Sequence, residues 1–311
     1  QSRNKNQEYY YLGNYIDGLS SIWQATGENY YLDTALSLIT TTMNDAVSVG
    51  NGYLGWPAQD GIEYALWDSF YWRNVATLLR VLHQSANLRA SGYQDEYDIL
   101  LAFTEKNIWN RYEANGSGNF YRSNTHMASH WARIGMELYI ITGKTKYKEV
   151  FDNISQGGMI GYPSNLRNQI YTNPKDAGAY AWDSKWGVAA GTGVQDTSHA
   201  GAIIHFWVLA YENHMYWNRA DIDSLLRTLN VVWLESDPTN IRVNVDGSGG
   251  AGISGRLNEW LYLGRYSPNL QNKIKNFYVE KHLNFFGSQA LGIATLNARI
   301  LADGRPIYPE N

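Results

Sequence analysis

Apolar residues recur along the chain at spacings of three and four, which place them on one face of a helix. In the range 11–26 the apolar positions are Leu12, Tyr15, Ile16, Leu19, Ile22 and Trp23. The same periodicity predicts about eleven helices, over 11–26, 30–47, 62–85, 95–112, 125–142, 146–154, 197–214, 219–234, 256–264, 270–283 and 289–301.

Two predicted helix–helix turns resemble each other. Each contains Thr-Gly, then three residues and a Tyr, at Gly27 and again at Gly143. Glycine at such a position ends one helix and lets the chain reverse into the next. Helical hairpins without a convincing strand predict an all-α fold, an (α/α) toroid of about six hairpins. A helical solenoid is the alternative, but no short period recurs.

Long irregular stretches interrupt the helices at 50–61, 156–195 and 236–255. The second is rich in Tyr and Trp, and we expect it to fold over the mouth of the toroid, although a packed loop without a ligand role is the alternative. No Pro-rich or low-complexity linker divides the chain, so residues 1–311 are predicted to form one domain.

Composition narrows the choice of partners. The 311 residues are 44% hydrophobic and carry a formal net charge of −4 without a Lys/Arg run, which argues against nucleic acid and anionic membranes. The best apolar run, 200–211, is too short to span a bilayer. The 24 Tyr and 12 Trp, beside only 17% charged residues, suit either stacking on sugar rings or a Tyr-rich helical core.

Three predicted helix starts carry polar groups that could bind one anion. Asn124 and Arg256 precede helices, and His199 follows the capping residue Asp196. Helix N-termini attract anions, so these groups would make a carboxylate site if the toroid gathers them. Each also has a purely structural interpretation, as a cap or a capping-turn residue.

Several familiar sequence motifs occur in the chain, but the residues around each of them do not fit the site that the motif normally forms. The glycines of 250–255 match a dinucleotide fingerprint, but a helix pair follows rather than a second strand. Arg242 occupies the first ligand position of a possible calcium loop. His126 and His130 lack the Glu of a metalloprotease helix, although His199 could approach them in space. We therefore expect no metal and no cofactor, and with no Cys in the chain we expect no thiol chemistry.

Taken together, Asn124, His199 in the sequence DTSHAG, and Arg256 six residues before Tyr262 resemble the active-site set of helical-toroid polysaccharide lyases. The resemblance is closest to the glucuronan and alginate lyases of polysaccharide lyase family thirty-eight. It implies that Asn124, His199 and Arg256 hold a substrate carboxylate and that Tyr262 is the catalytic acid and base.

Such a lyase would cleave 1,4-linked polyuronates, glucuronan or mannuronate-rich alginate, by syn β-elimination. Neutralising the carboxylate stabilises the enediolate that forms when H5 is removed. Tyr262 can serve as base and acid if Arg256 and His199 lower its pKa. Core packing beside Trp260 is the alternative role of this tyrosine.

Further residues are predicted to bind the sugar chain. We expect Trp56, Trp67 and Trp186 to stack on sugar rings, and Arg73, Lys185 and His130 to contact polar or acidic groups. The partner would be an acidic polysaccharide, and the protein a secreted or periplasmic monomer.

Two other functions remain open at this stage. An inverting glycoside hydrolase on the same toroid needs two carboxylic acids, which Glu63, Asp68, Asp183, Asp196 and Glu259 could supply. A non-catalytic glycan-binding protein would share the aromatic residues and release no product.

Overall fold

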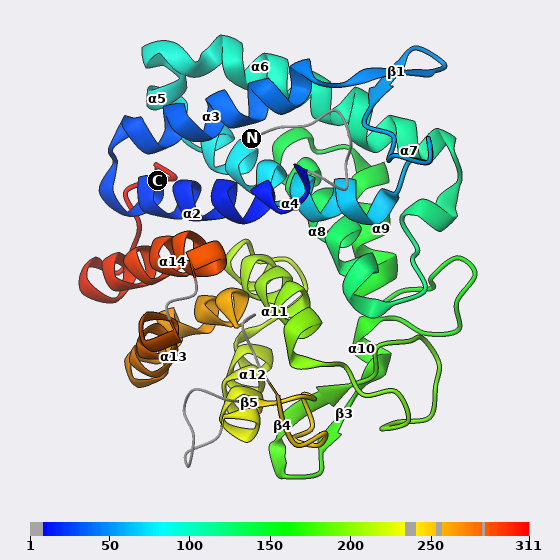
Figure 1. Cartoon of the computed structure of the whole chain (residues 1–311), viewed down its shortest axis with the longest axis vertical. Helices are drawn as coiled ribbons and strands as arrows, with labels where there is room; N and C mark the ends of the chain where they lie inside the picture. The colour runs from blue at the N-terminus through cyan, green and yellow to red at the C-terminus, as the bar shows by residue number, and fades with distance from the viewer. Residues whose placement is uncertain (1–8, 234–240, 253–256, 282–283, 311) are drawn as a thin grey trace.

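Helices arranged in two layers form a closed ring. The computed structural model describes residues 9–233, 241–252, 257–281 and 284–310. Within these residues, each inner element packs on the next around the ring, and the last packs on the first (Figure 1). The inner elements are α2 (Leu12–Thr26), α4 (Ala65–His83), α8 (Thr125–Thr142), α11 (Thr197–Glu212), η4 (Asn258–Tyr266) and α14 (Asn284–Asp303).

Outer helices alternate with the inner ones along the chain and pack on them from outside. They are α3 (Asn29–Asn44), α6 (Gln94–Phe103), α9 (Thr145–Ser155), α12 (Arg219–Val232) and α13 (Pro268–Lys281). This alternation of inner and outer helices is an (α/α) toroid, which confirms the fold predicted from the sequence.

Burial separates the two layers. Nearly every residue of α4 and α11 is buried, whereas α3 and α12 bury one face only. A helix that is covered on all sides is expected in the interior, and an amphipathic one at the surface. The predicted Thr-Gly turns end α2 and α8, where Gly27 and Gly143 have φ of 73° and 70° and donate to the carbonyls of Trp23 and Tyr139.

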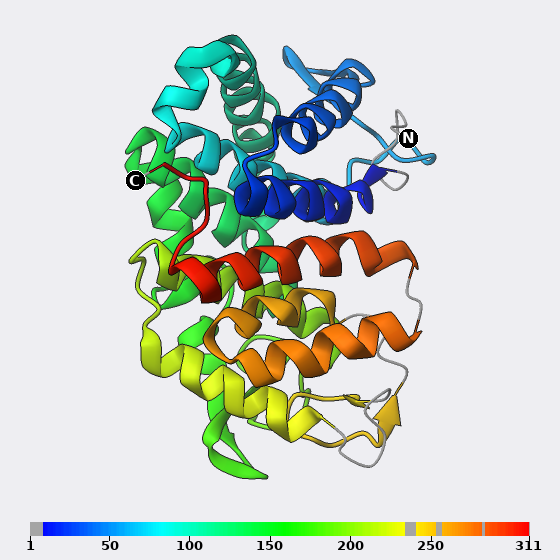
Figure 2. The same cartoon turned by 90° about the vertical axis from the view of Figure 1, so that its left-hand side faces the viewer.

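Glycines allow the first and last inner helices to meet. A Cβ on Gly18 would lie 2.8 Å from the Ser288 carbonyl oxygen, and one on Gly292 would collide with the Gly18 backbone. Figure 2 shows α14 lying directly alongside α2, where it closes the ring. The ring therefore brings residues near the N-terminus next to residues near position 260.

Three two-stranded antiparallel sheets decorate the helices in the described part of the chain. They pair β1 (Val47–Gly50) with β2 (Tyr53–Gly55), β3 (Ile170–Asn173) with β4 (Asp176–Trp182), and β5 (Ile241–Arg242) with β6 (Ala251–Gly252). The β3–β4 hairpin packs on α12, where Thr228 Oγ1 donates to the Tyr180 carbonyl at 2.8 Å.

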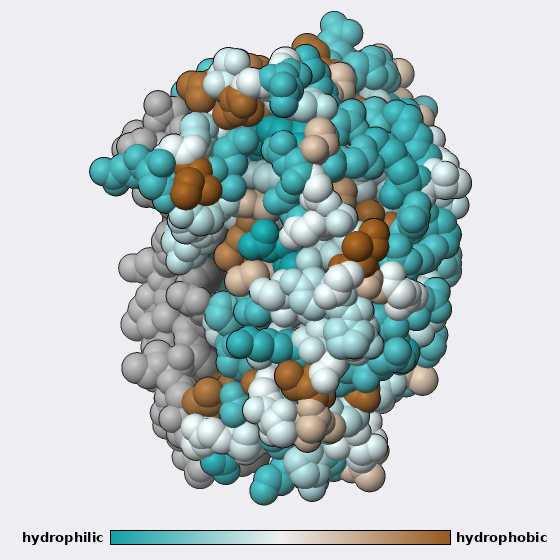
Figure 3. Space-filling model, turned by 90° about the vertical axis from the view of Figure 1, so that its right-hand side faces the viewer, coloured by the Kyte–Doolittle hydropathy of each residue, from teal (hydrophilic) through white to brown (hydrophobic). Residues whose placement is uncertain are grey.

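The long segment after β4 borders one opening of the ring. Thr125 N, at the start of α8, donates to the Ser184 carbonyl at 2.9 Å, and Val245 N donates to the Gln195 carbonyl at 3.0 Å. On the face shown in Figure 3, apolar side chains occur as separate spots among polar ones. Among the described helices, none is both long and apolar enough to cross a bilayer.

Candidate functional site

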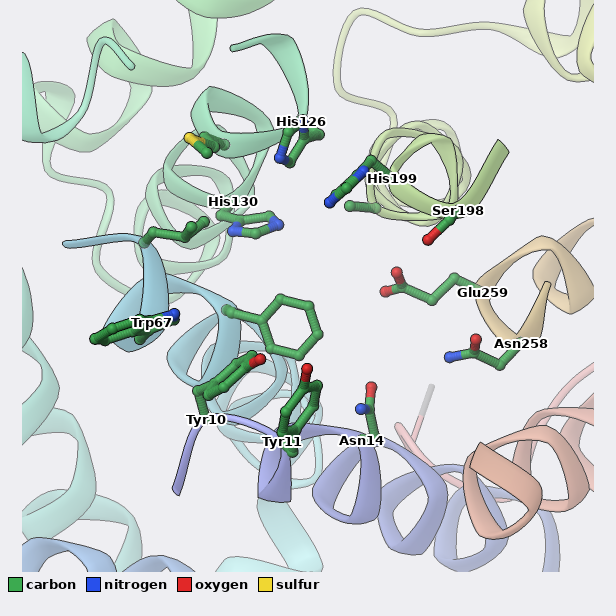
Figure 4. A pocket seen from close by; sticks show the side chains of 14 residues that line it. Tyr10, Tyr11, Asn14, Trp67, His126, His130, Ser198, His199, Asn258 and Glu259 are labelled. Carbon is green, nitrogen blue, oxygen red and sulfur yellow. The ribbon is translucent and has the colours of Figure 1, made fainter. Parts of the chain in front are cut away.

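A cavity of about 170 Å³ lies at the opening where the N-terminal ends of α2, α4, α8, α11 and η4 converge. We call it the histidine pocket. It is lined by Tyr10, Tyr11, Asn14, Leu66, Trp67, Phe70, His126, Met127, His130, Ser198, His199, Ala202, Asn258 and Glu259. Figure 4 shows His130 pointing into the pocket from α8 on one side, and His199 and Glu259 pointing into it from the neighbouring elements α11 and η4.

Two of the three histidines are held uncharged. His126 and His130 are four residues apart, so they lie one turn apart on α8. Burial, reinforced by the neighbouring His199, lowers the pKa of His126 to about 3. Burial and the nearby Arg73 hold the pKa of His130 well below its usual value. Both imidazoles therefore offer neutral hydrogen-bonding groups near neutral pH.

His199 is positioned by Asp196, one turn earlier. The Asp196 carboxylate caps α11 by accepting the His199 backbone N–H at 2.9 Å, and it also lies 2.8 Å from the ring nitrogen Nδ1. Burial alone would raise the pKa of Asp196, but the hydrogen bonds from His199 outweigh it and hold that pKa below its usual value. The carboxylate fixes Nδ1 as a donor, so Nε2 is the nitrogen left for a ligand.

Glu259 supplies the carboxylate of the pocket. Its Oε1 lies 2.9 Å from Arg73 Nη2, and the Arg73 side chain is completely buried behind it. Gly201 makes room for it on α11, because a Cβ there would lie 3.1 Å from the Glu259 Cβ. The ion pair balances a negative charge that would otherwise be costly to bury.

A buried histidine lies behind Glu259. His205 Nδ1 is 3.3 Å from Glu259 Oε1 and 2.9 Å from Arg133 Nη1. A guanidinium only donates, so Nδ1 of His205 is the unprotonated ring nitrogen. Burial, together with the charge of Arg133, holds the pKa of His205 well below its usual value. Arg73 is therefore the cation that compensates Glu259.

Several buried polar atoms around the pocket have no hydrogen-bond partner among the described residues. They are Nδ2 of Asn14, Nδ1 of His126 and Nη1 of Arg73. Asn14 is only 1% exposed and lines the pocket. Buried polar groups are normally hydrogen-bonded, so these atoms indicate a place for a polar ligand or ordered water.

Aromatic rings form the opposite wall. Tyr10 stacks on Trp67 with ring centroids 6.2 Å apart and an interplanar angle of 28°. Phe70 meets Tyr10 edge to face at 5.4 Å. This wall, facing carboxylate, imidazole and amide groups, has the mixture of flat apolar and hydrogen-bonding surface that a sugar ring requires.

Four residues singled out in the sequence meet at this pocket. Trp67, His130 and His199 line it, and Arg73 supports Glu259 from behind. Glu259 and Asp196, named as possible acids of a hydrolase, also lie here. Tyr10, Tyr11 and Asn14 also line the pocket and are not predicted from the sequence, although the run of three tyrosines at 9–11 is a possible signal.

The other predicted sugar platforms are not available to a ligand. Trp56 is 0% exposed and donates from Nε1 to the Thr42 carbonyl at 2.8 Å. Trp186 is also buried, and its Nε1 donates to the Arg122 carbonyl at 2.6 Å. Lys185 is exposed and lies outside the lining of the pocket. Its backbone forms an isolated β-bridge with that of Asn124.

The predicted catalytic tyrosine lies outside the histidine pocket. Tyr262 is 3% exposed, donates to Asp17 Oδ1 at 2.7 Å and stacks on His205. Burial and the adjacent Asp17 raise its pKa well above the usual value, whereas proton abstraction requires a lowered one. The proposed acid–base role of Tyr262 is therefore corrected.

The remaining members of the predicted set do not complete it. Asn124 is the N-terminal cap residue of α8, but its side chain makes no capping hydrogen bond, and it is not part of the pocket lining. Arg256 lies outside the described residues. Of the three groups that belong to the described part of the chain, only His199 lines the pocket.

Three of the five candidate acids have structural roles. Glu63 and Asp68 each pair with Arg111 at 2.5 Å, and Asp183 accepts the backbone N–H of Gly193 at 2.8 Å. Among the described residues, no group of three His, Cys, Asp or Glu side chains is placed to hold a metal ion. The chemistry available in the pocket is that of Glu259 and of the Asp196–His199 pair.

Comparison with known proteins addresses the fold. No protein family description and no curated protein matches the chain. A solved structure does match, over 94% of this chain and 89% of the other, with a TM-score of 0.51 and 13% sequence identity. It is an inactive variant, with two adjacent aspartates changed to asparagine, of the alpha-1,6-mannanase GH76A of Salegentibacter sp. HEL1_6 in complex with alpha-1,6-mannotriose. The likeness establishes the fold.

This comparison overturns the resemblance to polysaccharide lyases. The protein that the chain resembles in structure is a glycoside hydrolase on a helical toroid, not a carbon–oxygen lyase. The glucuronan and alginate lyase assignment, and the β-elimination drawn from it, are therefore wrong. The position of Tyr262 gives the physical reason, because the group chosen to remove the proton does not reach the pocket.

Proposed function

We propose that this protein is a glycoside hydrolase that binds a glycan in the histidine pocket and cleaves a glycosidic bond there. One observation carries the proposal: the side chains of Glu259 and His199 both point into one pocket that has an aromatic wall. The toroid fold shared with a mannanase supports the same class of reaction.

Hydrolysis needs one group that protonates the departing oxygen and another that activates water or attacks the sugar. His199 suits the first task, because Asp196 holds its Nδ1 and leaves Nε2 for the ligand. Glu259 suits the second, because its ion pair with Arg73 holds the carboxylate in place where it lines the pocket. The aromatic wall of Tyr10 and Trp67 holds the sugar ring in place.

The acids must differ from those of the mannanase. The inactive mannanase variant has two adjacent aspartates replaced, and this chain contains no two adjacent aspartates. If the chain hydrolyses a glycan, the pocket supplies Glu259 and His199 instead. This difference also argues against transferring the mannanase substrate unchanged.

We also propose that the glycan is acidic. Nη1 of Arg73, Nδ2 of Asn14 and Nδ1 of His126 lack partners among the described residues, and only Glu259 contributes a carboxylate to the lining. Amide and guanidinium groups of this kind would donate hydrogen bonds to a sugar carboxylate. The predicted location outside the cytoplasm, the monomeric state and the one-domain organisation stay proposals of the same kind.

The test is a panel of mannan, neutral glucans and uronate-containing polysaccharides, assayed both for new reducing ends and for ultraviolet absorbance. We expect new reducing ends without the absorbance of an unsaturated product. Glu259→Gln and His199→Ala should each lower kcat by about 10²–10⁴-fold. His214→Ala is the control, since His214 is exposed and lies outside the pocket.

Two results would count against the proposal. Oligosaccharide binding without product from any polymer would favour a non-catalytic glycan-binding protein. Full activity of both pocket variants would mean that the reaction occurs elsewhere. Preference for neutral over acidic polymers would overturn only the claim about the substrate charge.

A further inference from the structure

A second cavity, of about 570 Å³, lies at the opposite opening of the ring. The C-terminal ends of α2, α4, α11, η4 and α14 converge there, and the segment 304–310 forms one wall. We call it the C-terminal cavity. Its volume falls within the range of pockets that bind small molecules. It is separated from the histidine pocket by the length of the inner helices.

The charged groups of this cavity are largely paired. Arg265 Nη1 lies 2.9 Å from Glu212 Oε1, and Arg80 Nε lies 2.5 Å from Glu137 Oε2. Glu310 accepts the backbone N–H groups of Asn87 and Leu88 at 2.8 and 3.0 Å. Paired charges of both signs do not favour a strongly charged ligand.

Three side-chain amide groups at the cavity each form a hydrogen bond through only one of their two polar atoms. Gln24 Nε2 donates to the Ser20 carbonyl at 3.2 Å, and Asn213 Nδ2 donates to the Leu209 carbonyl at 2.8 Å. Gln84 Oε1 accepts from Arg80 Nη1 at 2.7 Å. Within the described part of the chain, the second polar atom of each of these amides forms no hydrogen bond.

The amide atoms that remain are two acceptors and one donor, Oε1 of Gln24, Oδ1 of Asn213 and Nε2 of Gln84. A hydroxyl group both donates and accepts, so neighbouring hydroxyls can satisfy such a mixture. Leu296, Ile300 and Pro306 provide an apolar wall beside the amides. Sugars present C–H faces and hydroxyl edges together, which matches this lining.

We propose that the C-terminal cavity is a second binding site, for a small polyhydroxylated ligand such as a mono- or disaccharide. This site does not depend on the function assigned to the histidine pocket, since the two share no lining residue. The amides of Gln84 and Asn213 bind the hydroxyl groups, and the apolar wall contacts the sugar C–H face.

The experiment follows backbone amide resonances of the deuterated, ¹⁵N-labelled protein during titration with D-mannose and D-glucuronate. We expect saturable shifts at Leu209, Asn213 and Gly304. Asn213→Trp should abolish them by filling the cavity, and Gln84→Leu should weaken binding by roughly two- to tenfold. Asn272→Leu, a change at an exposed position outside the cavity, is the control.

Glu259→Gln separates the two proposals, because it should leave these shifts unchanged whatever it does to hydrolysis. Sugar-induced shifts confined to Trp67 and His199 would overturn the second site, as would the absence of any shift. Equal shifts with cyclohexanol would show an apolar cavity without selectivity for hydroxyl groups and would also overturn it. Retained binding in Gln84→Leu would remove that amide from the site.

Discussion

Asp196 serves two groups on its own helix, because one carboxylate both caps α11 and holds the His199 ring. The sequence DTSH predicts the cap, since Asp three residues before an N–H donor is a standard helix start. It does not reveal which way the imidazole points. In the structure the ring lies beside that of His126 on a different helix, with ring centroids 4.3 Å apart. Local sequence therefore placed His199 at a helix start, and only the packing of two helices places it in a pocket.

Replacing Asp196 by Asn separates its two roles. Asn caps helices about as well as Asp, so we expect the free energy of unfolding to change by less than about 0.5 kcal/mol. An amide can present its NH₂ group to the ring nitrogen and no longer fixes Nδ1 of His199 as the donor, so kcat should fall by about 10²-fold with little change in KM. Asn218→Asp, the reverse exchange at the cap of α12, should leave kcat unchanged. An active Asp196→Asn variant would exclude His199 as the proton donor.

Among the elements, η4 shows where sequence periodicity misleads. The range 256–264 was predicted as a regular helix, on which positions six apart do not share a face. In the structure Asn258–Tyr266 is a 3₁₀ helix with three residues per turn, so Glu259, Tyr262 and Arg265 follow one another along one face. Glu259 reaches the histidine pocket, whereas Tyr262 and Arg265 line the C-terminal cavity. The sequence therefore predicts the segment that reaches the pocket, but Glu259 rather than Tyr262 is the residue of that segment that lines it.

The inner helices are easier to predict than their contacts. The boundaries of α2, α8 and α11 agree with the apolar pattern to within about two residues, because caps and Thr-Gly turns mark their ends. The contact of α2 with α14 depends instead on Gly18 and Gly292, which are far apart in sequence. A single sequence carries no signal that pairs these two glycines.

The contact between α2 and α14 can be tested with two glycine substitutions on α14. Gly292→Ala places a methyl group against the Gly18 backbone, so it should lower the free energy of unfolding by about 1–3 kcal/mol. A Cβ on Gly287 has no atom of the described residues within 4 Å, so Gly287→Ala should raise it by about 0.5–1 kcal/mol, because alanine is the better helix former. Urea unfolding measures both. If both substitutions change the free energy of unfolding in the same direction, close packing against Gly18 does not explain the need for glycine at position 292.

Across the whole molecule, the toroid was predictable because its helices repeat one pattern, whereas the sites were not. Closure of the ring brings Tyr10 and Asn14 from the start of the chain to Glu259 near its end. Between the two openings the interior contains charged and polar groups, including Arg73, Arg133 and His205. The buried histidines among these groups make the stability of the fold sensitive to pH.

The buried histidines determine whether the free energy of unfolding rises or falls with pH. His126, His130 and His205 all have pKa values lowered in the folded protein, with burial as the largest cause. Below about pH 6.5 the unfolded chain binds protons that the folded protein does not, so stability falls as the pH falls. At pH 5 each such histidine should cost on the order of 2 kcal/mol relative to pH 7.

One substitution tests this at a single group. His130→Phe removes the titrating ring, and Ser69 Oγ keeps its hydrogen bond to the Leu66 carbonyl at 3.0 Å. The loss of unfolding free energy between pH 7 and pH 5 should therefore be smaller than in the parent protein by on the order of 2 kcal/mol. His214→Asn is the control, because this exposed position has a φ of 56°, which Asn tolerates. Parallel pH profiles for the parent and His130→Phe would show that folding does not lower the pKa of His130, and the assignment of an uncharged imidazole in the pocket at pH 5 would have to be abandoned.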